Sequence, residues 1–182
     1  VGSEMCIRDS DDDSVLIPNP GYPTYSSITK LMGNKIIQYD LTEKNNWEPD
    51  FSKLKQLDLS KVKIMWVNYP NMPTGQTASV KLFKKIIQFG KENNILIVND
   101  NPYSFILNDN PLSIMSISGA MENCIELNSM SKIFNMAGWR VGFVIGNPTF
   151  IRNILKVKSN IDSGMFYPVQ MGAAHALSLI HI

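Results

Sequence analysis

Histidine, arginine and cysteine are all scarce in this chain of 182 residues. Their scarcity limits the kinds of active site and metal site that the chain could form. His175 and His181 are the only histidines and both lie near the end of the chain, so we do not expect a histidine-based active site. Cys6 and Cys124 show no paired spacing. A disulfide framework or a zinc site is therefore not expected, and a reducing cytoplasm is the compartment that fits best.

The chain also lacks a strong charge of either sign and any long apolar run. Its net charge is +1, so neither nucleic-acid binding nor membrane-surface binding is expected. No apolar run approaches the roughly 18 residues that a membrane span needs. No segment has the charged-then-apolar plan of a signal peptide. The 44% hydrophobic and 18% charged composition instead favours a globular domain of ordinary size.

The two ends differ in character from the rest of the chain. Residues 1–10 (VGSEMCIRDS) and 176–182 (ALSLIHI) resemble translated sequencing-adapter read-through; the alternative is that they are ordinary termini. We expect both stretches to be non-native and exclude them from fold reasoning. Residues 11–175 are then an internal fragment of a longer protein.

Short apolar runs alternate with helix-like stretches, which is the pattern of an α/β fold with a mostly parallel sheet. The runs are nearly all apolar rather than alternating, as expected of strands covered on both faces. Strands are predicted around residues 15–17, 36–37, 64–67, 95–98, 125–127 and 141–145. Apolar residues at helical spacing predict helices over residues 22–33, 79–90 and 148–161.

Polar, turn-forming segments follow four of these strands. They are PNPGYPTY (18–25), NYPNMPTG (68–75), NDNPY (99–103) and NSMSK (128–132). If the strands are parallel, all four segments lie along one edge of the sheet, where such folds bind ligands. The next strand begins near Arg140, eight residues after Lys132, which is too short for a crossover helix. We therefore expect an antiparallel return that brings Arg140 to the same edge as Lys132.

These segments resemble landmarks of the class I/II aminotransferases. SMSKIFNMAGWRVGF (129–143) is similar to the family's cofactor-lysine segment, S-x-S-K followed by G-W-R-x-G. PNPGYPTY, PNMPTG and DNPY resemble three further landmarks in the family's order, and the resemblance covers about residues 15–172. It implies the large domain of PLP fold type I, a three-layer α/β/α domain with one antiparallel strand in a mostly parallel sheet. That domain would be incomplete here.

The resemblance implies pyridoxal 5′-phosphate (PLP) as cofactor, and it implies roles for three residues. Lys132 would form a Schiff base with the PLP aldehyde and then shuttle the substrate proton. Asp100 would pair with the protonated ring nitrogen, and Tyr103 would hydrogen-bond the phenolic oxygen. The alternatives are a solvated lysine, a helix-capping or turn aspartate and a packing tyrosine.

The resemblance also implies residues that hold the phosphate and the ring. Ser129, Ser131 and Arg140 would bind the phosphate through hydroxyl and guanidinium donors. Tyr22 would stack on the ring face. Turn chemistry is the alternative for the serines, a surface ion pair for Arg140 and core packing for Tyr22.

One position departs from the family pattern. Where the family usually reads P-N-N-P-T-G, with the second Asn on the phenolic oxygen, this chain has Met72. A thioether is a weak acceptor and cannot donate. Either Tyr103 holds the phenolic oxygen with less help, or Asn71 turns inward.

The activity that the resemblance implies is transfer of an α-amino group from an amino acid to a 2-oxo acid, by a homodimer when full length. Residues 159–170 are similar to a stretch of LL-diaminopimelate and related aspartate-type aminotransferases. The family's phosphate-capping turn, partner-lent tyrosine and carboxylate-binding arginine have no counterpart here, so we expect the 182-residue chain by itself to be inactive. Two alternatives stay open: a carbon–sulfur lyase or decarboxylase with the same cofactor, and a non-catalytic effector domain of a transcription regulator.

Overall fold

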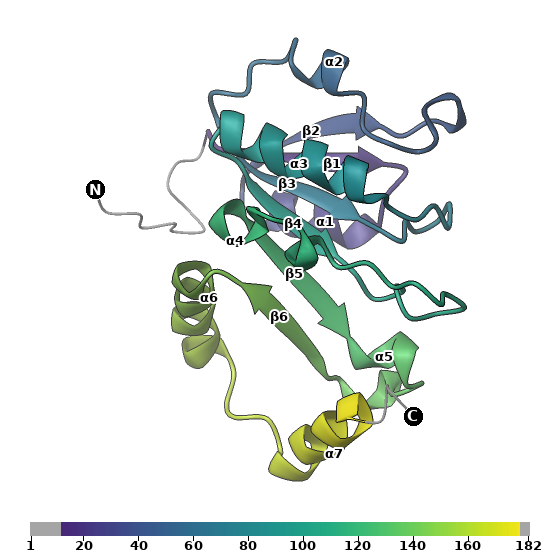
Figure 1. The fold of residues 1–182 in the computed structure, drawn as a ribbon. Helices are drawn as coiled ribbons and strands as arrows, with labels where there is room; N and C mark the ends of the chain where they lie inside the picture. The colour runs from purple at the N-terminus through teal and green to yellow at the C-terminus, as the bar shows by residue number, and fades with distance from the viewer. Residues whose placement is uncertain (1–11, 179–182) are drawn as a thin grey trace.

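The structure is a computed structural model that describes residues 12–178. Of the two ends expected to be non-native, residues 1–10 and 179–182 lie outside the described part. Residues 176–178 belong to its last helix. The six strands of the described part form one sheet of order β2-β1-β3-β4-β5-β6 (Figure 1). Their bounds are β1 Ser14–Asn19, β2 Lys35–Asp40, β3 Val62–Asn68, β4 Leu96–Asp100, β5 Cys124–Ser129 and β6 Gly142–Gly146. Each of the six predicted strands is confirmed, with boundaries shifted by a few residues.

The antiparallel return predicted after Lys132 is also confirmed. β1 to β5 pair in parallel, whereas β6 runs antiparallel to β5, with Ser129 opposite Gly142 and Ile125 opposite Gly146. Only the short helix α5 (Met130–Ile133) and the 3-10 turn η3 (Ala137–Trp139) separate the two strands. A connection of this length reverses the chain without crossing the sheet.

Helices cover both faces of the sheet, which gives the three layers expected (Figure 1). The longer helices are α1 Pro23–Leu31, α3 Val80–Glu92, α6 Pro148–Ile161 and α7 Tyr167–Ser178, and the short ones are α2 Phe51–Leu54 and α4 Ala120–Asn123. Ser79 is the N-cap of α3: its side chain accepts a hydrogen bond from the Leu82 N–H, which has no partner within the helix. Among residues 12–178, no helix is both long and apolar enough to cross a membrane.

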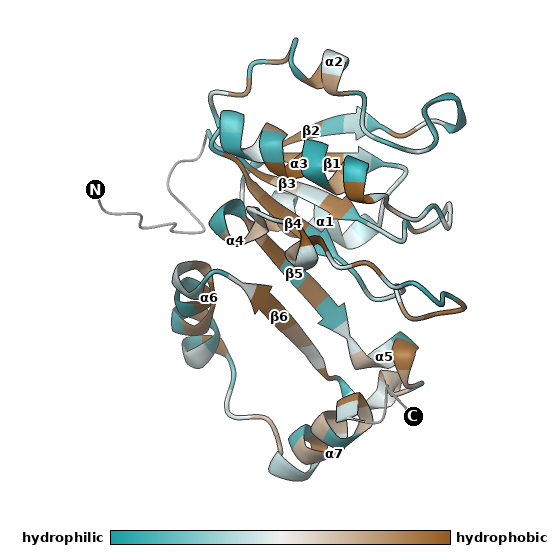
Figure 2. Ribbon diagram, viewed as in Figure 1, coloured by the Kyte–Doolittle hydropathy of each residue, from teal (hydrophilic) through white to brown (hydrophobic). Residues whose placement is uncertain are grey.

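Two apolar layers lie against the sheet. Phe83 and Ile86 of α3 are fully buried against Met65 and Ile97 of the sheet in the largest core cluster. On the opposite face, Tyr25 of α1 packs with β1, and α6 packs on β4 and β5. Figure 2 shows β6 hydrophobic over most of its length, whereas β5 becomes hydrophilic toward its C-terminal end. Polar residues therefore gather where the buried strands end.

Candidate functional site

A cavity of about 310 Å³ opens beside the carboxyl ends of β3, β4 and β5. The residues that line it are Tyr22, Tyr25, Asn68, Met72, Asp100, Pro102, Tyr103, Ser129, Ser131, Lys132, Ala137 and Arg140. All seven residues predicted as site residues are in this set, so the structure brings them together from four separate stretches of the chain. Their individual roles stay predictions.

Asp100 is the last residue of β4 and its carboxylate is largely enclosed. The Tyr25 hydroxyl donates to Asp100 Oδ2 at 2.6 Å, and the Asn68 amide donates to the Asp100 backbone oxygen at 2.7 Å. Burial raises the pKa of the Asp100 carboxyl above its ordinary value of 3.8, and the hydrogen bond from Tyr25 offsets part of that rise. The Asp100 carboxylate is therefore fixed in place, but a cationic partner would make its charge far less costly.

Two tyrosines at the start of α1 stand on one side of the cavity. Tyr22 is 46% exposed, so core packing does not account for it. Its ring meets that of Tyr25 edge-on at 5.8 Å, and Tyr25 in turn stacks on Trp66 at 4.6 Å. The pKa of Tyr25 is raised by burial and by the nearby Asp100 charge, so its hydroxyl stays protonated and acts as a donor. The stack supports Tyr22, whose ring reaches the cavity.

The turn after β5 presents a serine pair and a lysine. The Ser129 hydroxyl accepts from the Ser131 N–H at 3.1 Å and so caps the short helix α5. Lys132 is exposed and lines the cavity one residue further along. No acidic side chain among residues 12–178 forms a salt bridge with Lys132. Its amine is therefore not held by a carboxylate in the described part of the chain.

Arg140 lies two residues before β6 and lines the same cavity as the serine pair. Its backbone is left-handed, with φ of 55°, and its Nη1 donates to the Ala137 oxygen at 2.7 Å. This contact is not the surface ion pair considered as the alternative for Arg140, and no described carboxylate lies within salt-bridge distance of it. The free edge of the guanidinium and the hydroxyls of Ser129 and Ser131 are suited to hold one anionic group.

Tyr103 and Met72 also line the cavity, and Asn71 precedes Met72 in the turn after β3. The Asn71 Oδ1 accepts from the Thr74 hydroxyl at 2.8 Å, and Asn71 is not part of the cavity lining. Asn71 therefore shapes the turn through its Oδ1, while its buried Nδ2 has no partner among residues 12–178. Asn68 lines the cavity instead, and its Oδ1 accepts from the Met72 N–H at 2.7 Å.

Two polar residues of the lining, Tyr25 and Asn68, were not predicted from the sequence. Tyr25 was interpreted as part of the segment PNPGYPTY and of the helix predicted over 22–33, with no role in the site. Its spacing of three from Tyr22 already placed both rings on one side of that helix. Asn68 ends a buried strand at the same edge as Asp100. A buried polar residue in that position needs a partner, which was the available signal.

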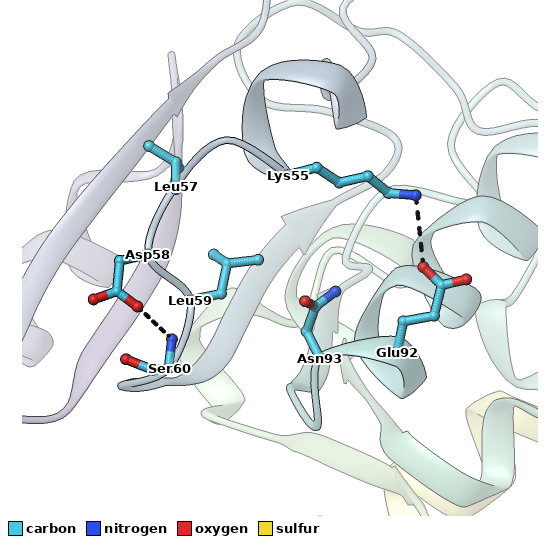
Figure 3. Close-up of a pocket in the computed structure, with 7 residues that line it drawn as sticks. All are labelled: Lys55, Leu57, Asp58, Leu59, Ser60, Glu92 and Asn93. Carbon is cyan, nitrogen blue, oxygen red and sulfur yellow. Dashed lines mark hydrogen bonds and ion pairs between the residues drawn. The ribbon is translucent and has the colours of Figure 1, made fainter.

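A second hollow, of about 580 Å³, lies at the surface near α2 and the end of α3 (Figure 3). Its polar groups engage one another: Lys55 pairs with Glu92 at 3.7 Å, and Asp58 accepts from the Ser60 N–H at 3.0 Å. Reactive groups do not converge on it. The smaller cavity at the strand ends is therefore the candidate site.

Comparison with known proteins agrees with this geometry. Residues 1–180 match the family model described as aminotransferase class I and II. The chain is 43% identical over 169 residues to the LL-diaminopimelate aminotransferase of Gloeobacter violaceus and 44% identical over 171 residues to that of Natranaerobius thermophilus. These alignments cover 92% and 93% of the chain but only 43% and 44% of the relatives.

A solved structure agrees as well. The apo-BacF structure from Bacillus subtilis superposes with a TM-score of 0.89 at 39% identity, covering 92% of this chain and 43% of that one. The chain thus spans less than half the length of the relatives it matches. Sequence and fold together show that the chain belongs to the class I and II aminotransferase family.

Proposed function

We propose that this chain forms the cofactor-binding part of a PLP-dependent aminotransferase that moves an α-amino group from an amino acid to a 2-oxo acid. The observation that carries the proposal is the convergence of Lys132, Asp100 and Arg140 on one cavity at the strand ends. Membership of the family supports it, because enzymes of this class generally use PLP. The aminotransferase names of the relatives favour this reaction over lyase or decarboxylase chemistry and over a non-catalytic effector domain.

The residues present fit PLP on the chemistry of their donors and acceptors. Ser129, Ser131 and Arg140 supply donors for the phosphate, and Asp100 supplies a buried carboxylate for the ring-nitrogen cation. Tyr22 offers an exposed aromatic face to the flat ring. PLP, when bound, acts as an electron sink for the substrate's α-carbon. A cation at its ring nitrogen is also the partner that the enclosed Asp100 carboxylate lacks among residues 12–178.

Lys132 is the residue assigned to proton transfer. Its amine would hold the cofactor at the aldehyde carbon, with the aldehyde oxygen leaving as water. Once the incoming amino acid displaces it, the free amine would take the proton from the substrate's α-carbon and deliver it to the cofactor carbon. No described carboxylate forms a salt bridge with Lys132, so its amine is free to bind a group in the cavity. Tyr103, which also lines the cavity, would donate its hydroxyl proton to the phenolic oxygen.

The relatives' names suggest the substrate class. We propose an amino donor of the LL-diaminopimelate type, an amino acid whose side chain carries a second charged end. The homodimeric state and the cytoplasmic location implied by the resemblance are part of the same proposal. So is the inactivity of the 182-residue chain by itself, since the chain spans less than half the length of the relatives that it matches.

The test uses the product of the gene that carries this sequence, expressed whole. Added PLP should give a visible absorbance band, and borohydride should fix the cofactor onto a peptide that contains Lys132. Lys132→Ala should abolish fixation, whereas Lys84→Ala, an exposed lysine of α3, should leave it intact. Absence of a fixable band in the wild type would refute the proposal.

A second measurement tests the reaction itself. An aminotransferase releases a 2-oxo acid and aminates its acceptor in equal amounts. Release of ammonia without an aminated product, with thiol from a sulfur-containing donor, would show a lyase instead.

A further inference from the structure

Glu126, in the middle of β5, is a buried carboxylate that the proposed reaction does not use. It is 1% exposed. Five donors converge on it: Asn99 Nδ2 at 2.9 Å and the Ile114 N–H at 2.9 Å on Oε2, and Ser113 Oγ at 2.9 Å, Asn101 Nδ2 at 3.2 Å and Asn128 Nδ2 at 3.2 Å on Oε1. Five donors on two oxygens match an ionised carboxylate, which only accepts.

Burying such a charge costs free energy unless donors surround it. An apolar side chain at position 126 would cost less free energy to bury, because the neighbouring Cys124 and Ile125 already pack in apolar clusters. Three of the five donors belong to residues next to site residues. Asn99 and Asn101 flank Asp100, and Asn128 precedes Ser129. The arrangement of these donors points to a function in the site rather than in the core.

The sheet register explains how Glu126 acts on the opposite face. Asn99 lies directly opposite Glu126, and Asp100 lies opposite Leu127. Side chains alternate between faces along a strand, so Asn99 and Asn101 share the Glu126 face while Asp100 points to the other. The Asn101 N–H donates to the Leu127 oxygen at 2.8 Å, which continues the pairing one residue beyond β4.

The same alternation applies along β5. Asn128 shares the Glu126 face, and Ser129 points with Leu127 to the other. Core packing agrees, because Cys124 joins the α3-side cluster whereas Ile125 joins the cluster on the α6 side. Glu126 therefore lies on the α3 side of the sheet, and Asp100 and Ser129 point to the other side at the same strand ends.

We propose that Glu126 is a positioning residue: by binding the amides of Asn99, Asn101 and Asn128 on one face, it holds Asp100 and Ser129 toward the cofactor cavity on the other. Its assignment to cofactor binding rests on the proposed function. Without the anion, the three amides lose their common acceptor, and the chain beyond β4 is free to rotate. Asp100 then loses its fixed direction.

Glu126→Gln tests this in the whole protein with nearly unchanged side-chain volume. The new amide donor can still be accommodated, because Asn99 Oδ1 and Asn101 Oδ1 have no partner among residues 12–178. Two quantities are measured: the dissociation constant for PLP, and the low-field NMR signal of the Tyr25 hydroxyl proton in the apoprotein, assigned by its loss in Tyr25→Phe. We expect PLP binding to weaken by about tenfold or more, and the Tyr25 signal to shift or vanish.

Ser113→Ala is the matched control. It removes one hydrogen bond from the same carboxylate without touching the three amides, so it should lower thermal stability and leave both readouts unchanged. Asn101→Ala, which keeps Glu126, is the second variant. It decides the question by the same two readouts if Glu126→Gln does not fold.

The outcomes separate this proposal from the proposed function. Unchanged PLP affinity and an unchanged Tyr25 signal in Glu126→Gln would overturn it, as would equal effects from Ser113→Ala. If the wild type binds no PLP, the proposed function fails. The Tyr25 signal, which needs no cofactor, then decides by itself whether Glu126 orients Asp100.

Discussion

The Tyr25 hydroxyl donates to Asp100 Oδ2 at 2.6 Å, a contact that joins the start of α1 to the end of β4 across 75 residues of sequence. Tyr25 is itself held by its stack on Trp66, at 4.6 Å between ring centroids. Among residues 12–178, no other hydrogen bond reaches the Asp100 side-chain oxygens. Tyr25 therefore both orients this carboxylate and favours its ionised form.

Replacing Tyr25 by Phe should weaken PLP binding by about tenfold. The ring and its stack on Trp66 stay, but Asp100 loses a charge-assisted hydrogen bond, of the kind that contributes about 1.5–3 kcal/mol. The pKa of Asp100 should also rise further, because that bond is what lowers it. Fluorescence titration of the whole apoprotein with PLP measures the effect.

Tyr39→Phe is the matched control for Tyr25→Phe. The Tyr39 hydroxyl donates to the Trp66 oxygen at 2.6 Å, and its ring belongs to the large core cluster rather than to the cavity. It should cost stability and leave PLP affinity unchanged. Equal affinity losses in the two variants would show that the Tyr25 effect is general destabilisation.

The sequence was informative wherever the signal is local. Apolar runs such as 64–67 and 95–98 become strands because they are buried on both faces, and the eight-residue gap between Lys132 and Arg140 leaves room only for a reversal. The edge where the predicted site residues meet follows from these two facts. The mostly parallel sheet and its antiparallel return were thus accessible from pattern alone.

What the sequence could not provide was the pairing of side chains far apart in the chain. Asn99, Glu126 and Asn128 resemble turn or surface residues when considered singly. Only the register that places Asn99 opposite Glu126 shows that they share one buried network. Tyr25 was hidden in the same way, because its helical spacing fits core packing as well as contact with a strand end.

Asp100→Asn should stabilise the cofactor-free protein at neutral pH. A folded-state pKa raised above the ordinary 3.8 means that the neutral carboxyl is favoured by folding. Its contribution to stability is complete below about pH 3.8 and is lost as the pH rises through the raised value. Asn removes this loss, so the variant should exceed the wild type at neutral pH and match it at the acid end.

Thermal unfolding over a pH series measures this difference, and saturating PLP should reverse the order of the two proteins. Asp58→Asn is the control of opposite sign, since hydrogen bonds from Ser60 lower the pKa of that exposed carboxyl. It should give no gain at neutral pH. A wild-type apoprotein that is more stable than Asp100→Asn at neutral pH contradicts the assignment of burial as the dominant influence on Asp100.

Met72→Asn should move the pH titration of bound PLP to lower values. Met72 lines the cavity, and its thioether cannot donate a hydrogen bond. An amide at this position would donate a hydrogen bond to the phenolic oxygen of PLP and stabilise that oxygen as an anion. The bound cofactor would then lose its proton at a lower pH. The midpoint of the absorbance change with pH measures it. Met72→Leu, which adds no donor, should leave the midpoint in place, and an equal shift in both variants would contradict the argument.

Gly142→Ala should destabilise the edge that carries Arg140. A Cβ at Gly142 would lie 2.8 Å from the Asn128 backbone oxygen, in the pairing of β5 with β6. Backbone cannot yield as a flexible side chain does, so the strands must separate, at a cost of about 1–3 kcal/mol by analogy with overpacked cores. Urea unfolding measures this loss of stability, with Gly138→Ala, whose Cβ meets nothing within 4 Å, as the control.

Because β6 begins two residues after Arg140, Gly142→Ala should also weaken PLP binding. A loss of stability with unchanged PLP affinity would show that Arg140 keeps its place independently of the strand.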